Sequence, residues 1–369
     1  MLTRRQVAAS LFGSAAALLL PAPPARAGTP SLDTLARRSG RVFGAAMRAD
    51  QLAAEPALRE AAAAQCGMLT PEIHLKWNSI EHRKGSIWFQ PVDELVAFAA
   101  GNGQQIYGHT LLWEQGTPDW ALRELKARRD WRLVAGHMER VLGRYGDTIE
   151  VWDVVNEPID PQAGKDGLRR NVFHRAFGPG YIADALETAR HYAPRARLML
   201  NDYSFEYDNP VEADRRKAFL KLLAGLKGRG VPLDGVGVQA HLDLGKGPLK
   251  PSVIAPFLQE IAEMGLDIYV TELDVKERDY RASTETRDAR VADEVSRYLD
   301  IALDQRAVKG VTAWGLSDRH SWLKVERGDR VDRKRHGDPA PNRGLPYDAA
   351  MRRKPMYDAL ARAFAGGLT

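Results

Sequence analysis

Short apolar runs alternate with amphipathic stretches along most of the chain. The runs read as buried parallel strands and fall at residues 41–47, 68–75, 104–108, 149–155, 196–200, 234–239, 267–271 and 309–314. Apolar residues recur three and four positions apart in the intervening stretches, which predicts helices, as at 91–103, 131–146, 181–194 and 293–307. Eight such repeats predict an α/β fold of the (β/α)8 TIM-barrel type. An open doubly wound sheet is the alternative, but no Gly-rich phosphate-binding motif follows the first run.

The chain is expected to form one globular domain. No linker, low-complexity tract or sequence repeat divides residues 31–369, and 44% apolar with 27% charged residues is the composition of a globular protein. The single cysteine, Cys66, cannot form an internal disulfide, and it excludes zinc-finger and iron–sulfur spacings. Because small and apolar residues surround Cys66, we expect a buried and inert thiol.

Residues 1–27 have the layout of a cleaved export signal, which leaves residues 28–369 as the mature domain. Two arginines precede an apolar run at 7–20, and prolines and Ala25-Arg26-Ala27 follow it. The run is short for a bilayer span, so no stable membrane anchor is expected. The paired arginines are similar to a twin-arginine signal, and Sec export is the alternative. The destination would be the periplasm or the medium.

The net charge changes when the signal is removed. The full chain has 53 Lys+Arg against 48 Asp+Glu, a formal charge of +5. Cleavage removes Arg4, Arg5 and Arg26 and no acidic residue, which lowers +5 to +2. With this small excess and no recognised motif, a nucleic-acid partner is not expected.

Polar and aromatic side chains follow the predicted strands, where a TIM barrel carries its active site. They are Glu72, Lys76, His109, Trp113, Asn156, Glu157, Asn201, Asp202, Gln239, His241, Glu272, Asp274 and Trp314. Carboxylates, amides and indoles together suit a polyhydroxylated ligand, because indoles cover the apolar faces of sugar rings. Glu157 and Glu272 each follow a buried run directly, and they could supply the two carboxyl groups that glycosidic cleavage requires.

Seven segments resemble motifs of glycoside hydrolase family 10, a family of retaining (β/α)8 endo-1,4-β-xylanases. They are HTLLW at 109–113, WDVVNEP at 152–158, LNDY at 200–203, DGVGVQAH at 234–241, VTELDV at 270–275, WGLSDRHSWL at 314–323 and KPMY at 354–357. The resemblance covers residues 43–357 and implies double-displacement cleavage of internal xylan bonds by a monomer, with no metal or organic cofactor. Another β-glycanase on this scaffold, or a non-catalytic polysaccharide-binding protein, remains an alternative.

The resemblance implies a role for each candidate residue. Glu157 corresponds to the acid/base and Glu272 to the nucleophile. His241 and Asp274 correspond to the partners of the nucleophile in an Asp–His–Glu chain, which would keep Glu272 ionised. Glu157 must instead hold its proton near neutral pH, which burial or the charge of Glu272 would favour.

Further residues correspond to substrate contacts in the family. Asn156 matches the residue that binds the 2-hydroxyl of the reacting sugar, and Gln239 and His109 match its neighbours. Other matches are Glu72 and Lys76 of the strand-2 motif, Trp113, Trp314 and Trp322 of the glycone wall, and Tyr203 on the leaving-group side. The family also implies a cis peptide between His109 and Thr110.

The chain departs from the family pattern in four places. Ile73 replaces an Asn that helps to bind the second glycone sugar, which makes a preference for xylan less secure. Glu114 stands where His is usual, and Ser204 stands where Asn is usual. The segment 324–343 carries seven basic and four acidic residues. It is expected to be a surface loop over the sugar site; the sharper hypothesis is that it contacts acid-decorated polysaccharide.

Overall fold

The computed structural model describes residues 30–278, 281–323 and 341–366. The predicted signal at 1–27 and residues 324–340 of the predicted loop lie outside the described residues. The strands of the described part are β1 (Val42–Met47), β2 (Met68–Pro71), β3 (Gln105–Gly108), β4 (Val151–Asn156), β5 (Arg197–Asp202), β6 (Gly235–Val238), β7 (His241–Asp243), β8 (Asp267–Lys276) and β9 (Val308–Ala313).

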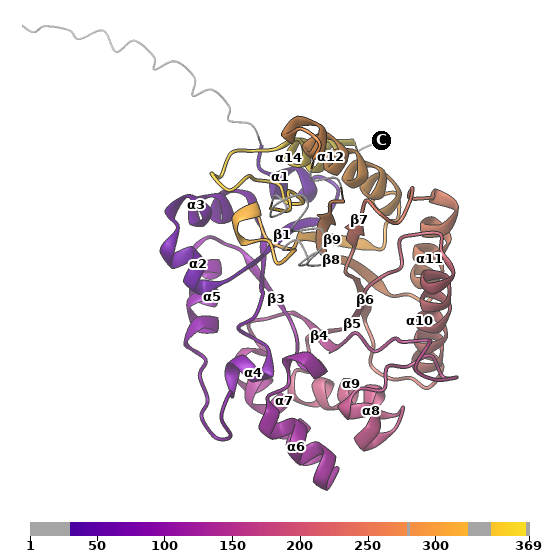
Figure 1. Cartoon of the computed structure of the whole chain (residues 1–369). Coiled ribbons are helices and arrows are strands. Elements are labelled where there is room, and N and C mark those ends of the chain that lie inside the picture. Colours follow the sequence, from indigo (N-terminus) through magenta and orange to yellow (C-terminus); the bar gives the residue numbers. More distant parts are fainter. Residues whose placement is uncertain (1–29, 279–280, 324–340, 367–369) are drawn as a thin grey trace, which may run out of the picture. The chain divides into compact units, whose positions relative to one another are not determined.

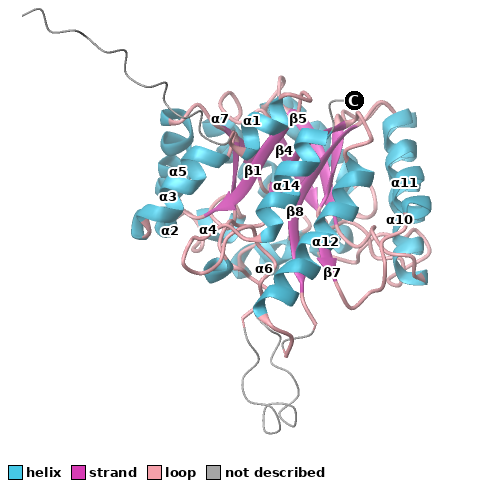
Figure 2. Ribbon diagram, turned by 90° about the horizontal axis from the view of Figure 1, so that it is seen from above, coloured by secondary structure: helices cyan, strands magenta, loops and turns pink. Residues whose placement is uncertain are grey.

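These strands form a closed parallel barrel. Their order is β6-β5-β4-β3-β2-β1-β9-β8-β7, and an additional pairing of β6 with β8 closes the ring. β7 pairs only with the end of β8, beyond the closed part. Figure 1 shows the strands around a central axis with helices outside them, and Figure 2, turned by 90°, shows the strands between the helices. The predicted TIM barrel is therefore confirmed.

Helices connect successive strands, except β6 and β7, and cover the outside of the barrel. The described helices are α1 (Leu32–Arg37), α2 (Ala49–Ala54), α3 (Pro56–Gln65), α4 (Trp77–Ile80), α5 (Gln90–Gly101), α6 (Asp119–Arg128), α7 (Trp131–Tyr145), α8 (Val172–Phe177), α9 (Tyr181–Tyr192), α10 (Pro210–Gly228), α11 (Pro251–Glu263), α12 (Thr284–Ala302) and α14 (Pro355–Gly366). The 3₁₀ helices are η1 (Glu114–Gly116) and η2 (Asp318–His320). All four helices named from the periodicity are present, as α5, α7, α9 and α12.

Helix α7 illustrates why the spacing of apolar residues predicted the helices. The Asp130 side chain accepts the backbone N–H of Arg132 and caps the first turn. Val134, Met138 and Val141, spaced three and four apart, are fully buried. This spacing places them on one face of the helix, which packs on the barrel while the opposite face meets solvent.

Two strand boundaries differ from the prediction by more than two residues. The run at 68–75 was expected to be one strand, but β2 ends at Pro71, residues 72–75 form turns and Lys76 is in a bend. Leu75 lies in this turn and its side chain is buried in the core. The run is apolar at this position because of tertiary packing and not because it is a strand. Strand β8 extends beyond the predicted 267–271 to Lys276, because β7 provides its continuation with a hydrogen-bonding partner.

The structure also shows the surroundings of the single cysteine. Cys66 is buried at the end of α3, as predicted, and burial raises the pKa of its thiol. A raised pKa disfavours the reactive thiolate. Within the described ranges, no helix is both long and apolar enough to cross a membrane.

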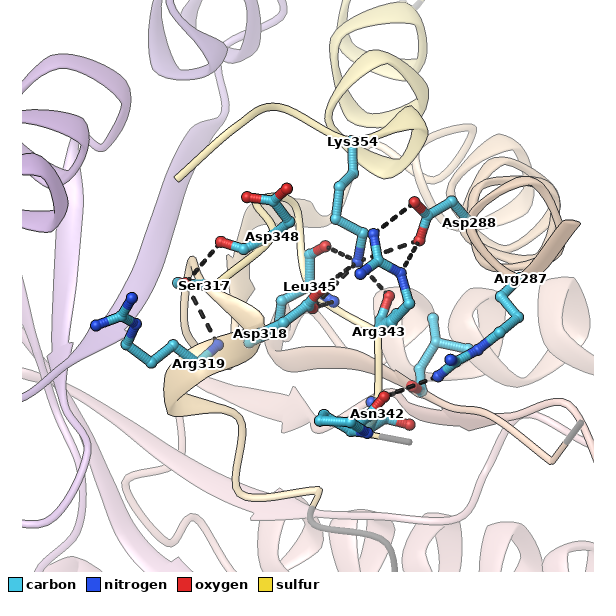
Figure 3. A network of polar contacts seen from close by, with 12 residues as sticks. Arg287, Asp288, Ser317, Asp318, Arg319, Asn342, Arg343, Leu345, Asp348 and Lys354 are labelled. Atoms are coloured by element: carbon cyan, nitrogen blue, oxygen red, sulfur yellow. Dashed lines mark hydrogen bonds and ion pairs between the residues drawn. The ribbon is translucent and has the colours of Figure 1, made fainter. Parts of the chain in front are cut away.

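A buried polar network holds the return of the chain from β9 to α14 (Figure 3). The Lys354 ammonium lies 2.8 Å from Asp318 Oδ2 and donates to the Leu345 carbonyl at 3.0 Å. Arg343 binds both carboxylate oxygens of Asp288 on α12 at 2.7 Å. Asn342 donates to the Val275 carbonyl of β8 at 3.0 Å. The network therefore fixes residues 341–354 against the carboxyl end of the barrel.

Candidate active site

A cavity of about 630 Å³ lies at the carboxyl ends of the strands. Its lining consists of Glu72, Lys76, His109, Trp113, Gln115, Asn156, Glu157, Tyr203, Ser204, Gln239, His241, Leu242, Asp243, Lys246, Glu272, Lys276, Trp314, Trp322, Leu323 and Asn342. Three of the candidates named from the sequence are not in this set: Asn201, Asp202 and Asp274, of which Asp274 lies behind His241. The fold thus gathers side chains that are up to 270 positions apart in the sequence, from Glu72 to Asn342.

Glu272 is a buried carboxylate that is surrounded by donors. Oε1 accepts the side-chain amide of Asn201 at 2.8 Å, and Oε2 lies 3.2 Å from His241 Nε2. Burial raises the pKa of Glu272, but the His241 hydrogen bond and the nearby His109 and Lys76 outweigh burial, so the net pKa is lowered. This carboxyl group is therefore ionised at neutral pH.

His241 lies between two carboxylates and completes a chain that reaches Trp322. Its Nδ1 lies 2.8 Å from Asp274 Oδ1, while the other oxygen of Asp274 accepts the Trp322 indole N–H at 2.6 Å. His241 and Asp274 are register partners of β7 and β8, which explains how the short β7 places the imidazole. Burial lowers the pKa of His241, but Asp274 and Glu272 raise it well above its usual value. The imidazolium donates in both directions.

Glu157 directly follows β4 in a left-handed backbone conformation with φ +56°. Its N–H donates to the Asn201 carbonyl at 2.7 Å, and its carbonyl accepts from Arg169 Nε at 2.8 Å. Non-glycine residues adopt this conformation rarely and keep it where the surrounding structure holds them. The side chain is half-buried and faces the cavity.

Amide side chains connect the two carboxyl-bearing strands. Asn201 Nδ2 donates to Asn156 Oδ1 at 2.9 Å as well as to Glu272, and Thr271 Oγ1 donates to Asn201 Oδ1 at 2.7 Å. Gln239 Nε2 lies 3.3 Å from the same Asn156 oxygen. Since its oxygen accepts both amides, the orientation of Asn156 is set, and its Nδ2 lies 3.5 Å from Glu157 Oε1.

His109 is held in the floor of the cavity. Its Nδ1 lies 2.8 Å from Asp153 Oδ2, and the other Asp153 oxygen accepts the Tyr107 hydroxyl at 2.8 Å. The His109 ring meets Trp314 edge-on, with centroids 5.4 Å apart. The peptide bond between His109 and Thr110 is cis, as the resemblance implied.

Lys76 and Trp113 lie next to each other in the lining of the cavity. The Lys76 ammonium lies 4.6 Å from the centroid of the Trp113 ring. Burial lowers the pKa of Lys76, and Glu272, Glu72 and Glu157 oppose that effect. Ile73, the residue at the usual Asn position, is half-buried and does not line the cavity. At this position the chain therefore offers no hydrogen bond to a sugar.

Tyr203 and Ser204 line the cavity after β5. The Arg215 guanidinium lies 4.2 Å from the centroid of the Tyr203 ring, and Arg169 donates to the Tyr203 hydroxyl at 2.9 Å. Ser204 Oγ, at the usual Asn position, is 3.4 Å from Lys246 Nζ. The other departure, Glu114, pairs with Arg175 of α8 at 2.6 Å and does not line the cavity.

Several residues of the site had no role in the sequence prediction. Asn201 and Asp202 were visible at a strand end in LNDY, but nothing in the pattern separated a buried partner from a substrate contact. Asp153 lies inside the apolar run of β4, and its polarity within a strand was a usable signal. Arg169 and Arg215 come from a loop and a helix, and no spacing rule predicts that they approach the site.

Comparisons with known proteins agree with this geometry. The family model for glycosyl hydrolase family 10 matches residues 31–363. The chain belongs to this family. Endo-1,4-beta-xylanase 3 from Hypocrea jecorina is 32% identical over 339 residues, which are 91% of this chain and 86% of the relative. Family 10 enzymes are retaining glycoside hydrolases.

Solved structures of family 10 xylanases show the same barrel. Native xylanase 10B from Thermotoga maritima superposes with a TM-score of 0.78 at 29% identity, covering 92% of this chain and 99% of the other. Xylanase 10B from Thermotoga petrophila in complex with xylobiose gives a TM-score of 0.79 at 28% identity, with the same coverage. The likeness spans the whole barrel of this family 10 chain rather than one motif.

Proposed function

We propose that this family 10 chain is an endo-1,4-β-xylanase in which Glu272 is the nucleophile and Glu157 the acid/base. The observation that carries the assignment is the contrast between the two carboxyl groups. Glu272 is buried and receives the Asn201 amide and the His241 imidazolium, whereas Glu157 is half-buried with one amide contact at 3.5 Å. A retaining glycosidase needs an ionised carboxyl group as its nucleophile, and the donors around Glu272 assign that role to Glu272 rather than to Glu157.

The reaction proceeds in two balanced steps. A carboxylate oxygen of Glu272 bonds to the anomeric carbon while the glycosidic bond breaks, and Glu157 transfers its proton to the departing oxygen. Glu157 then takes a proton from water, whose oxygen bonds to the anomeric carbon as Glu272 leaves. In this geometry Asn156 binds the 2-hydroxyl of the reacting sugar, where a hydrogen bond strengthens as the transition state forms.

The walls of the cavity match the chemistry of a β-linked xylose chain. Trp113, Trp314 and Trp322 present flat apolar surfaces for the glycone sugars, and Tyr203 presents one for the leaving group. Glu72, Lys76, His109 and Gln239 supply polar contacts among these rings.

Two measurements test the activity and its glycan. Reducing-sugar release is compared on xylan, cellulose and mixed β-glucan, with xylan expected to be the preferred substrate. Inactivity of the wild type on every glycan would support a binding protein instead. Because Ile73 does not line the cavity, Ile73→Asn should change kcat/KM on xylo-oligosaccharides by less than about 3-fold, which is less than the value of one hydrogen bond.

We also propose that residues 1–27 are removed on export to the periplasm or the medium. The support is the order of charged, apolar and small residues in this segment. Expression of the full chain in a bacterial host, followed by N-terminal sequencing of the extracytoplasmic product, should give a mature terminus at Gly28. Replacement of Arg4 and Arg5 by lysine should block a twin-arginine route and leave Sec export intact.

A further inference from the structure

One arginine outside the cavity connects Glu157 to Tyr203. Arg169 lies in the loop between β4 and α8, and its guanidinium serves three acceptors. Nε donates to the Glu157 carbonyl at 2.8 Å, and Nη2 donates to the Ile159 carbonyl at 3.3 Å and to the Tyr203 hydroxyl at 2.9 Å. A planar guanidinium can hold several acceptors at once in fixed directions, which a lysine ammonium on a flexible stem cannot.

Arg169 also holds the backbone that follows Glu157. Its own N–H donates to the Pro158 carbonyl at 2.7 Å, so its main chain and side chain together grip residues 157–159. Glu157 has φ +56°, a conformation that needs such support. The carbonyl of Glu157 accepts from Arg169, and its N–H donates to the Asn201 carbonyl. These two hydrogen bonds fix the backbone on both sides of the Glu157 Cα, and so they set the direction of its side chain.

The Tyr203 ring is held from two sides. The Arg215 guanidinium lies 4.2 Å from the ring centroid, and Arg215 Nε donates to the Tyr203 carbonyl at 2.9 Å. Arg169 then binds the hydroxyl at the tip of the ring. Both Glu157 and Tyr203 line the cavity, whereas Arg169 does not.

We propose that Arg169 is a positioning residue that sets the acid/base Glu157 and the leaving-group platform Tyr203 as one unit. The inference rests on the function proposed above. Protonation of a glycosidic oxygen requires the carboxyl group and the departing sugar in a defined mutual geometry, and a displacement of about 1 Å can cost on the order of 100-fold in rate. One guanidinium that holds both partners limits that displacement.

The test compares two substrates, one whose leaving group must be protonated by Glu157 and one whose leaving group needs no proton. Xylotetraose has a poor leaving group and places sugars on the Tyr203 side, whereas 2,4-dinitrophenyl β-xylobioside releases a phenolate that needs no proton. The kcat/KM ratio of the two substrates is measured for wild type, Arg169→Met, Arg169→Lys and Tyr203→Phe. The control, Arg190→Met, removes an arginine of α9 that likewise has three acceptors: Pro194, Ala196 and Asp234.

We expect Arg169→Met to lose on the order of 100-fold in kcat/KM on xylotetraose and less than about 5-fold on the dinitrophenyl substrate, which needs no acid. Arg169→Lys should recover only part of the loss. Tyr203→Phe should lose about 3–10-fold on xylotetraose alone, and little further loss should follow when it is combined with Arg169→Met. Arg190→Met should leave the ratio unchanged.

Equal losses on both substrates, or an unchanged ratio in Arg169→Met, would overturn the proposal. If Arg169→Met does not give a cooperative thermal transition, Tyr203→Phe decides alone, and an unchanged ratio in that variant overturns it. A wild type that cleaves neither substrate refutes the proposed function. A wild type that cleaves both while every variant keeps the ratio refutes only the role of Arg169.

Discussion

Replacing Asp274 by asparagine removes the buried charge behind His241 with little change in shape. Asp274 has no solvent exposure, and its two oxygens bind His241 at 2.8 Å and the Trp322 indole at 2.6 Å. The raised pKa of His241 depends on Asp274 and Glu272 against the effect of burial. Without the Asp274 charge, His241 should be neutral at a pH where it is now an imidazolium.

The effect on Glu272 follows from the loss of a charged donor. Its Oε2 lies 3.2 Å from His241 Nε2. Hydrogen bonds that involve charged groups contribute about 1.5–3 kcal/mol, and one pKa unit corresponds to about 1.4 kcal/mol. The pKa of Glu272 should therefore rise by about 1–2 units in Asp274→Asn. The Asn201 amide and Lys76 would still favour the ionised form.

The pH dependence of kcat/KM measures this shift directly, because it reports the pKa values of the free enzyme. With 2,4-dinitrophenyl β-xylobioside as substrate, protonation of the leaving group is not needed, and the acidic limb reports Glu272. The nucleophile must be ionised, so a raised pKa moves that limb to higher pH by about 1–2 units. Asp234→Asn is the matched control, because Asp234 pairs with Arg190 and does not line the cavity.

An acidic limb at the same pH in Asp274→Asn and wild type would refute this account of how Glu272 is kept ionised. A fall in kcat/KM without a shift of the limb would assign Asp274 to the orientation of His241 alone. Chemical denaturation of the variant at the pH of assay shows that folding is not responsible for the change.

Three further outcomes are expected. Glu272→Ala should reduce turnover to background while xylo-oligosaccharide binding by calorimetry is retained; unchanged turnover would exclude Glu272 as the nucleophile. Asn201→Ala removes the donor that Glu272 and Asn156 share, and should lower kcat/KM by about 10–100-fold. Lys354→Met should lower the free energy of unfolding in urea by about 3–5 kcal/mol at pH 7. The loss should shrink towards pH 4, because burial raises the pKa of Asp318 to about 6 despite Lys354, so its carboxyl group is then neutral in the fold.

The rule that strand ends carry function predicted most of the site because it depends only on local pattern. Glu157 and Glu272 follow apolar runs at positions where a barrel presents side chains to its open end. The same rule led to His241, which lines the cavity, although its own short strand β7 was not predicted. Three residues bounded by a left-handed Ala240 are too few to give a periodic signal.

The sequence pattern said least about hydrogen bonds between a site residue and a side chain from a different strand, helix or loop. Asp274 was named as the partner of His241 by resemblance, and the register of β7 on β8 supplies the contact. Its second contact, with Trp322, connects β8 to the segment after η2 and has no counterpart in the sequence pattern. Trp322 was expected only as a wall for sugars.

The sequence by itself determined the class of fold, the family of the chain and many of the residues that face the cavity. These properties depend on periodicity and short motifs, which are local. Tertiary structure alone revealed further groups around each carboxyl: Asn201 beside Glu272, Trp322 against Asp274, and Arg169 behind Glu157. Electrostatic and hydrogen-bonding effects depend on distances across the barrel, and those distances arise only when the strands close into a ring.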